Sequence, residues 1–213
     1  MLIAVALAGA AWAQGVINRG RQARSALAEA PVLPDPRILK PLLLDYEAVV
    51  ADVYWIRTIQ YVGEHILTDR QTPALYPLVR FVTTLDPEFV DAYRIGALLL
   101  TFDEADVPKA VKLLEEGRAH NPGRWEFPHD LGRIHYLFLK DNGKALYWWQ
   151  LAAEYPGSPT YLPRFVARLH AATGEVETAL QLWTQLYETA PNEFLREQAR
   201  EEIKKLLKQL RKT

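Results

Sequence analysis

Four prolines divide most of this chain into segments of nearly equal length. They recur at spacings of 35, 34 and 35 residues: Pro87, Pro122, Pro156 and Pro191. A second series consists of small residues, each directly after an apolar one, at spacings of 33, 36 and 35 residues: Gly63, Gly96, Gly132 and Ala167. A repeat of a few tens of residues is the signature of a protein whose units bury their apolar faces against their neighbours.

Within each period, small and bulky apolar residues occupy similar places before the closing proline. They stand about twelve, eight and five positions before it. The sets are Ala110, Leu114 and Gly117, then Ala145, Trp149 and Ala152, then Ala179, Trp183 and Leu186. Small residues let two helices approach closely, and a bulky residue fills the angle between them. Because no stretch alternates as a strand would, the pattern predicts an all-α fold.

These positions resemble the tetratricopeptide repeat (TPR) family, whose unit of about 34 residues is a helix–turn–helix with a closing proline. The resemblance extends over roughly residues 50–192, and the fourth unit, with Gly174, Ala179, Trp183 and Pro191, matches best. It implies a right-handed α-solenoid of about four TPR-like helix pairs. Residues 51–63 are also similar to the corresponding segment of amino-terminally anchored bacterial TPR proteins.

The first unit departs from the family pattern. Leu75, Val79 and Val82 stand where small residues are expected, and the opening helix, about residues 45–66, is longer than usual. We therefore predict repeats over residues 42–192, with the first unit the least regular. Residues 31–41 hold four prolines in eleven residues and are predicted to be a spacer.

Residues 193–213 are predicted to form an amphipathic capping helix. One apolar stripe runs along it: Leu195, Ala199, Ile203, Leu206 and Leu210. Its acidic residues come early and its basic residues late, which is the order that the helix dipole favours. A helix of this kind covers the apolar face that the last repeat of a solenoid would otherwise expose.

Residues 1–30 are predicted to be an apolar signal or anchor segment followed by a basic helix. The apolar run of residues 2–13 would reach about 18 Å as a helix, short of a bilayer core of about 30 Å. Ala11-Trp12-Ala13 has the pattern of a cleavage site. We expect an exported or membrane-anchored body on the periplasmic side of the cell envelope. Arg19, Arg21 and Arg24 favour the alternative, a cytoplasmic body.

Composition argues against several classes of function. The 25 Lys and Arg residues are matched by 26 Asp and Glu residues, which disfavours a generic nucleic-acid binder. The chain has no cysteine, which excludes thiol nucleophiles and cysteine-bound metal centres. The five histidines form no metal motif, and His135 and His170 are expected to pack inside helix pairs. We therefore predict no enzyme activity, no cofactor and no metal site.

The family resemblance places the first helix of each pair on a concave, partner-binding face. In this register the predicted binding residues are Arg57, Gln60, Glu64, Tyr93, Glu126, His129, Arg133, Tyr136, Tyr161, Arg164 and Arg168. Arginine and tyrosine, concentrated in the later units, are common at interfaces and suit a segment with carboxylates. The Lys/Asn carboxylate clamp of chaperone-binding TPR proteins is not reproduced, and a solvated face without a ligand remains an alternative.

The predicted function is a non-catalytic scaffold that binds a protein or peptide segment. The predicted signal or anchor segment favours an envelope assembly factor or an accessory subunit of a membrane-associated complex. The alternative is a soluble cytoplasmic adaptor that recognises the peptide tail of a partner. Three consecutive aromatic residues stand at positions 147–149. Trp149 is expected in the core, and Tyr147 or Trp148 is expected either to pack inside the protein or to contact a partner.

Overall fold

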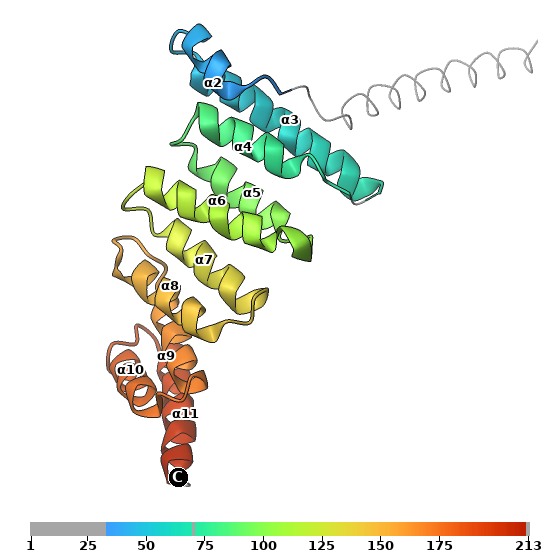
Figure 1. The fold of residues 1–213 in the computed structure, drawn as a ribbon. Coiled ribbons are helices and arrows are strands. Elements are labelled where there is room, and N and C mark those ends of the chain that lie inside the picture. Colours follow the sequence, from blue (N-terminus) through green and yellow to red (C-terminus); the bar gives the residue numbers. More distant parts are fainter. Residues whose placement is uncertain (1–32, 70, 212–213) are drawn as a thin grey trace, which may run out of the picture. The chain divides into compact units, whose positions relative to one another are not determined.

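The structure, a computed structural model, describes residues 33–69 and 71–211 (Figure 1). All regular structure in these residues is helical, as predicted, with ten α-helices and two short 3-10 helices. The α-helices are α2 (Pro36–Leu39), α3 (Glu47–Leu67), α4 (Leu75–Leu85), α5 (Val90–Leu100), α6 (Val107–His120), α7 (Glu126–Leu137), α8 (Asn142–Glu154), α9 (Leu162–Ala172), α10 (Val176–Glu188) and α11 (Glu193–Leu210). The 3-10 helices are η1 (Lys40–Leu42) and η2 (Glu104–Asp106). The predicted signal or anchor segment, residues 1–30, lies outside the described residues.

The described residues form two compact units, with the boundary between Ala92 and Tyr93. In the second unit each helix from α6 onward packs against the next one along the chain, so that α6 contacts α7, α7 contacts α8, and so on to α11. Helix pairs stacked in chain order are the arrangement of an α-solenoid, and the predicted fold class of TPR-like pairs is confirmed. Within the described residues, no helix is both long and apolar enough to cross a membrane.

The small residues of the repeat lie where two helices approach most closely. Ala145, Ala152 and Ala179 are completely buried. A Cβ atom built on Gly132 of α7 would lie 2.3 Å from Cδ1 of Trp149 in α8, far inside van der Waals contact. One built on Gly117 of α6 would lie 2.4 Å from the ring of Phe127 in α7. Gly117 and Gly132 therefore allow ring-against-backbone packing between neighbouring helices, whereas a Cβ atom built on Gly63 of α3 would meet no atom within 4 Å.

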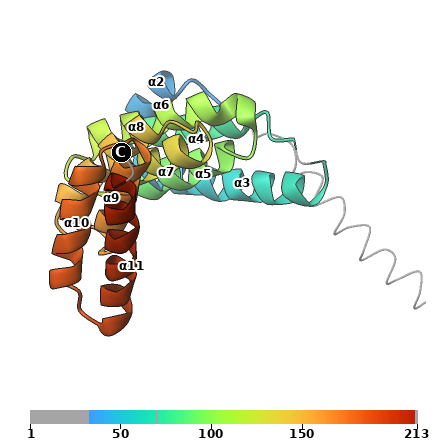
Figure 2. The ribbon, with the colours of Figure 1, turned by 90° about the horizontal axis from the view of Figure 1, so that it is seen from below.

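Helix α11 caps the second unit as predicted. Asn192 caps its amino terminus by accepting a hydrogen bond from the backbone N–H of Leu195 at 2.9 Å. Ala199 and Leu206 are buried in a cluster with Trp183 of α10 and Ala167 of α9. Figure 2 shows α10 and α11 lying side by side. The apolar stripe of this helix thus covers the last helix pair.

In the first unit, α3 and α4 enclose a cluster that includes Ala51, Phe81, Val82 and Leu85. The opening helix is long, as expected, with 21 residues.

The segment expected to be a spacer belongs to this unit. Its described part contains α2, and Leu33 and Leu39 pack against the cluster. A helix is compatible with this proline-rich sequence because Pro36 stands at the first helical position, where no N–H is needed. Asp35 caps the helix by accepting a hydrogen bond from the backbone N–H of Arg37 at 2.9 Å.

Candidate functional site

A groove of about 470 Å³ opens in the second unit where α7, α8 and α9 meet. Aromatic rings form most of its lining. We call it the aromatic groove, and its lining residues are His129, Arg133, Tyr136, Leu137, Trp149, Tyr161 and Phe165. Helix α7 contributes four of them, at i, i+4, i+7 and i+8, which is the spacing of one helical face.

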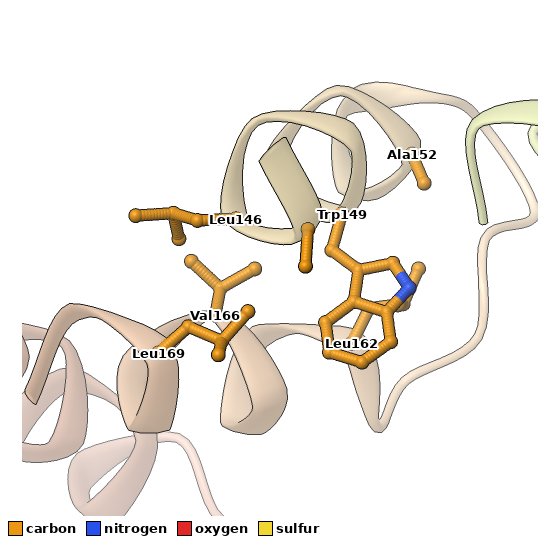
Figure 3. Close-up of a cluster of buried hydrophobic side chains, with 7 residues drawn as sticks. Leu146, Trp149, Ala152, Leu162, Val166 and Leu169 are labelled. Carbon is orange, nitrogen blue, oxygen red and sulfur yellow. The ribbon is translucent and has the colours of Figure 1, made fainter. Parts of the chain in front are cut away.

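Trp149 forms the floor of the aromatic groove. It is buried and belongs to a cluster with Leu162, Val166 and Leu169 of α9 (Figure 3). Its indole N–H donates a hydrogen bond of 3.0 Å to the backbone carbonyl oxygen of His129. Because its one polar atom is already bonded, Trp149 offers only an apolar surface to a ligand.

The walls of the groove are rings in contact with this floor and with one another. The Trp149 ring lies 5.4 Å from the ring of Tyr136 and 5.2 Å from that of Phe165, measured between centroids. Phe165 in turn lies 5.7 Å from Tyr161 in an edge-to-face arrangement. Tyr136, Phe165 and Tyr161 are each more than a third exposed, so the rings fix one another while their outer surfaces remain accessible.

A hydrogen-bond chain fixes the side of the groove where α7 meets Tyr161. The Tyr161 hydroxyl lies 2.8 Å from Nε2 of His129, and Nδ1 of the same ring lies 3.2 Å from Oδ1 of Asp130. An ionised carboxylate can only accept, so Nδ1–H donates to Asp130, and in the neutral imidazole Nε2 then accepts from the hydroxyl. This chain holds the Tyr161 ring in place.

Asp130 is a buried carboxylate in contact with two residues that line the groove, His129 and Arg133. It accepts a hydrogen bond from Nε of Arg94 at 2.7 Å and lies 3.3 Å from Nη2 of Arg133. Burial alone would raise the pKa of Asp130, but the hydrogen bonds from His129 and Arg94 and the charges of Arg94 and Arg133 together lower it below its usual value. One carboxylate thus holds two arginines, and the cluster carries a net positive charge.

We expect Asp130→Asn to destabilise the protein by about 3 kcal/mol at neutral pH, because it leaves two arginines around a neutral group. Since the folded pKa of Asp130 is lowered, its stabilising contribution is complete above the unfolded pKa of about 3.9 and is lost as the pH falls through the folded pKa. The difference in free energy of unfolding between wild type and variant should therefore shrink in acid. Urea unfolding of both proteins from neutral pH into acid tests this expectation, with a substitution at an exposed carboxylate, Glu154→Gln, as the control. A difference in unfolding free energy that does not change with pH would refute the assigned role of Asp130.

The structure brings four of the predicted binding residues to the groove: His129, Arg133, Tyr136 and Tyr161. The other three lining residues were not predicted to face a partner. Trp149 was correctly expected in the core, yet one side of its ring is the groove floor. Phe165 follows Arg164 on α9, and its exposed ring could have been placed on this face from its spacing of four residues from Tyr161.

Other predicted residues in the second unit make contacts away from the groove. Arg164 donates a hydrogen bond of 3.0 Å to Oε1 of Gln198 in α11, and the Arg168 guanidinium lies 5.9 Å from the centre of the Trp183 ring. Glu126 forms an ion pair of 3.1 Å with Arg124. Arg164 and Arg168 thus connect α9 to α11 and α10, whereas Glu126 pairs with a residue two positions before it in the chain.

Tyr93 was predicted to line the partner-binding face, and this prediction is wrong. Its side chain is only 1% exposed and packs edge-to-face against Phe127 at 6.1 Å, so it cannot line a binding surface. The reason is local: Gly117 leaves space beside both rings, and the tyrosine turns inward to fill it. The remaining predicted residues lie on α3 of the first unit, where Arg57 and Gln60 are exposed and Glu64 is half-buried.

The buried histidines and the two aromatic residues directly before Trp149 lie outside the aromatic groove. His135 and His170 are buried, as expected, and burial lowers the pKa of His135. Trp148 is buried, with the Arg118 guanidinium 5.4 Å from its ring centre, and Tyr147 is exposed. In the part of the chain that the structure describes, no group of three or more histidine and carboxylate residues is placed to hold a metal ion.

No protein-family model matches this chain, and no curated protein matches it. Among solved structures it is similar to a thermophilic TPR protein of Thermus thermophilus, at 15% sequence identity and a TM-score of 0.46. The similarity covers 77% of this chain and 98% of that chain. The order and packing of the helices in this chain are themselves those of an α-solenoid.

Proposed function

We propose that this protein is a non-catalytic interaction scaffold that binds a peptide segment of a partner in the aromatic groove. The observation that carries the proposal is an accessible, ring-lined cavity in which the polar atoms of Trp149 and Tyr161 are already bonded within the protein. Such a surface gains free energy mainly by covering apolar area. Tyrosine, tryptophan and arginine, which line this groove, are the residues that most often dominate binding at protein interfaces.

The charge around the groove favours a segment that also carries a carboxylate. Arg94 and Arg133 share a single buried carboxylate, Asp130, and Nε of Arg133 is buried without a hydrogen-bond partner. Arg133 lines the groove, so a carboxylate next to the apolar anchor would be attracted to it. We therefore propose a ligand segment with one aromatic or branched aliphatic anchor and a neighbouring Asp, Glu or carboxyl terminus.

Selection from a random peptide library against the full-length chain tests this function. We expect enriched peptides to share an apolar anchor beside an acidic residue. Phe165→Ala should weaken their binding at least about tenfold by removing a wall of the groove. Arg133→Gln should weaken binding about fivefold for acidic peptides and much less for the same peptides with amide in place of carboxylate.

Arg168→Gln is the matched control, because Arg168 lies on the same helix as Phe165 but does not line the groove. Its affinity for the peptides should equal that of the wild type in a fluorescence titration. Enriched peptides that bind the Phe165→Ala variant as tightly as the wild type would contradict the assignment of the groove.

We also propose that the scaffold acts in the cell envelope, as an assembly factor or accessory subunit of a membrane-associated complex. The support is the apolar sequence of residues 2–13 and the small-x-small pattern that ends it. Fractionation of cells that express the chain with and without residues 1–30 tests the location. Envelope recovery that depends on these residues is expected, whereas recovery of both forms in the cytoplasm would favour the adaptor that recognises a partner's tail.

A further inference from the structure

Helix α3 has apolar residues on two opposite sides. One side is buried in the first unit and includes Ala51, Tyr61 and Val62. The other side is exposed along the whole helix, with Ile56 57% and Leu67 83% exposed. A surface helix of a globular protein normally has one apolar stripe and one polar face. The second stripe of α3 therefore requires a separate explanation.

The spacing of the exposed residues is that of a coiled coil. Counting from Val49, they alternate by four and three residues, which is the a/d pattern of a heptad repeat. We call this set the α3 seam, and it consists of Val49, Val53, Ile56, Gln60, Gly63 and Leu67. All six are exposed, and Ile59 and Ile66 extend the apolar surface along one edge. A Cβ atom placed on Gly63 would meet no atom within 4 Å, so this position is open to another helix.

We propose that the α3 seam pairs with the α3 seam of a second copy of this chain, parallel and in register. Charge complementarity along the edges of the seam favours a second copy as its partner. Asp52 and Arg57 flank it on opposite edges and are five residues apart, which is the g-to-e′ spacing that forms ion pairs between parallel coiled-coil helices. Because the dimer would be two-fold symmetric, the ion pair between Asp52 and Arg57 would form twice.

Gln60 supports the same register. It is the one polar side chain of the seam, and in a parallel dimer it lies opposite its own counterpart, where two amides can hydrogen-bond to each other. An antiparallel pairing that used the whole length of the seam would instead place Arg57 opposite Arg57 of the second copy. Like charges at that position oppose this alternative. The inference concerns the first unit alone and does not depend on the aromatic groove.

The full-length chain should therefore sediment as a dimer, with twice its mass of 24.3 kDa. Asp52→Arg or Arg57→Asp alone should raise the dissociation constant of the dimer about tenfold by replacing two attractive pairs with two repulsive ones. The double variant with both changes should recover the affinity of the wild type. An equal mixture of the two single variants should form heterodimers, because each chain then supplies the charge that the other lacks.

Glu64→Lys is the matched control, a charge reversal on the same helix. In the parallel arrangement Glu64 lies beside Ile59 of the second copy, so its reversal should leave the dimer intact. A dimer that is broken by Glu64→Lys and not by Asp52→Arg would overturn the parallel register. A wild-type chain that stays monomeric at all accessible concentrations would overturn the proposal itself.

Because the chain has no cysteine, a single introduced thiol can report the geometry directly. Val53→Cys places the two thiols opposite each other across a parallel seam and should give a disulfide-linked dimer on mild oxidation. Ala48→Cys, exposed but about 100° around the helix from Val49, should give none. Equal cross-linking of both variants would indicate random collision and refute the seam. Circular dichroism and melting of each variant keep loss of pairing separate from loss of folding.

Discussion

Removal of residues 193–213 should convert the protein into an aggregating, poorly folded chain. The deletion takes away α11 and uncovers Trp183, Ala179 and Val176 of α10, all of which are now buried. It also removes the hydrogen bonds from Arg200 to Tyr187 and from Arg164 to Gln198. The lost burial is on the order of 5 kcal/mol, a large share of the stability of a typical domain. Light scattering, thermal melting and dye binding to exposed apolar surface should all report the change.

Alanine substitutions at two neighbouring leucines of α11, one buried and one exposed, test the same capping role. Leu206 is 5% exposed and faces the cluster, whereas Leu207 is 41% exposed. Leu206→Ala should cost about 2–3 kcal/mol of unfolding free energy, while Leu207→Ala should cost less than about 1 kcal/mol. A soluble, cooperatively folding truncation, or equal effects of the two substitutions, would show that α11 does not act as a cap.

Gly132→Ala should destabilise the second unit and distort the aromatic groove by adding one methyl group. The new Cβ would lie 2.3 Å from Cδ1 and 2.5 Å from Nε1 of Trp149, so the indole or helix α8 must move. Movement of the indole breaks its hydrogen bond to the carbonyl of His129 and displaces the groove floor. We expect a loss of about 2–4 kcal/mol, measured by urea unfolding, and weaker binding of groove peptides by the folded variant.

Gly143→Ala in α8 is the control for this prediction. Its added Cβ would lie 3.6 Å from Oδ1 of Asp141, an ordinary contact, and alanine is the better helix former. This variant should be as stable as the wild type or more stable by up to about 1 kcal/mol. Equal unfolding free energies of the two alanine variants would show that Gly132 is not needed for the close approach of α7 and α8.

The fold was accessible from the sequence because its main signals are periodic and local. The spacing of Gly132, Ala145, Trp149 and Ala152 marks the places where helices touch, and each of these residues is buried in the structure. The apolar stripe and the cap of α11 depend only on residues within that helix and on Asn192 before it. Such patterns repeat in every unit, so several weak signals reinforce one another.

The candidate site was only partly accessible. Helical register placed His129, Arg133 and Tyr136 on one face of α7, and they do share the groove. The same register put Tyr93 on the binding surface, where the structure instead buries it against Phe127. Register gives the direction of a side chain around its helix, but the room available to it depends on the neighbouring helix.

The sequence by itself determined the helical repeat, the order of the helices and the cap, because each follows from spacing along the chain. Only the tertiary structure decided that Tyr161 reaches His129 across 32 residues, that Asp130 is buried beneath two arginines, and that the second apolar side of α3 is left uncovered. These features depend on distances between helices, which the packing of whole side chains sets and which no periodicity encodes.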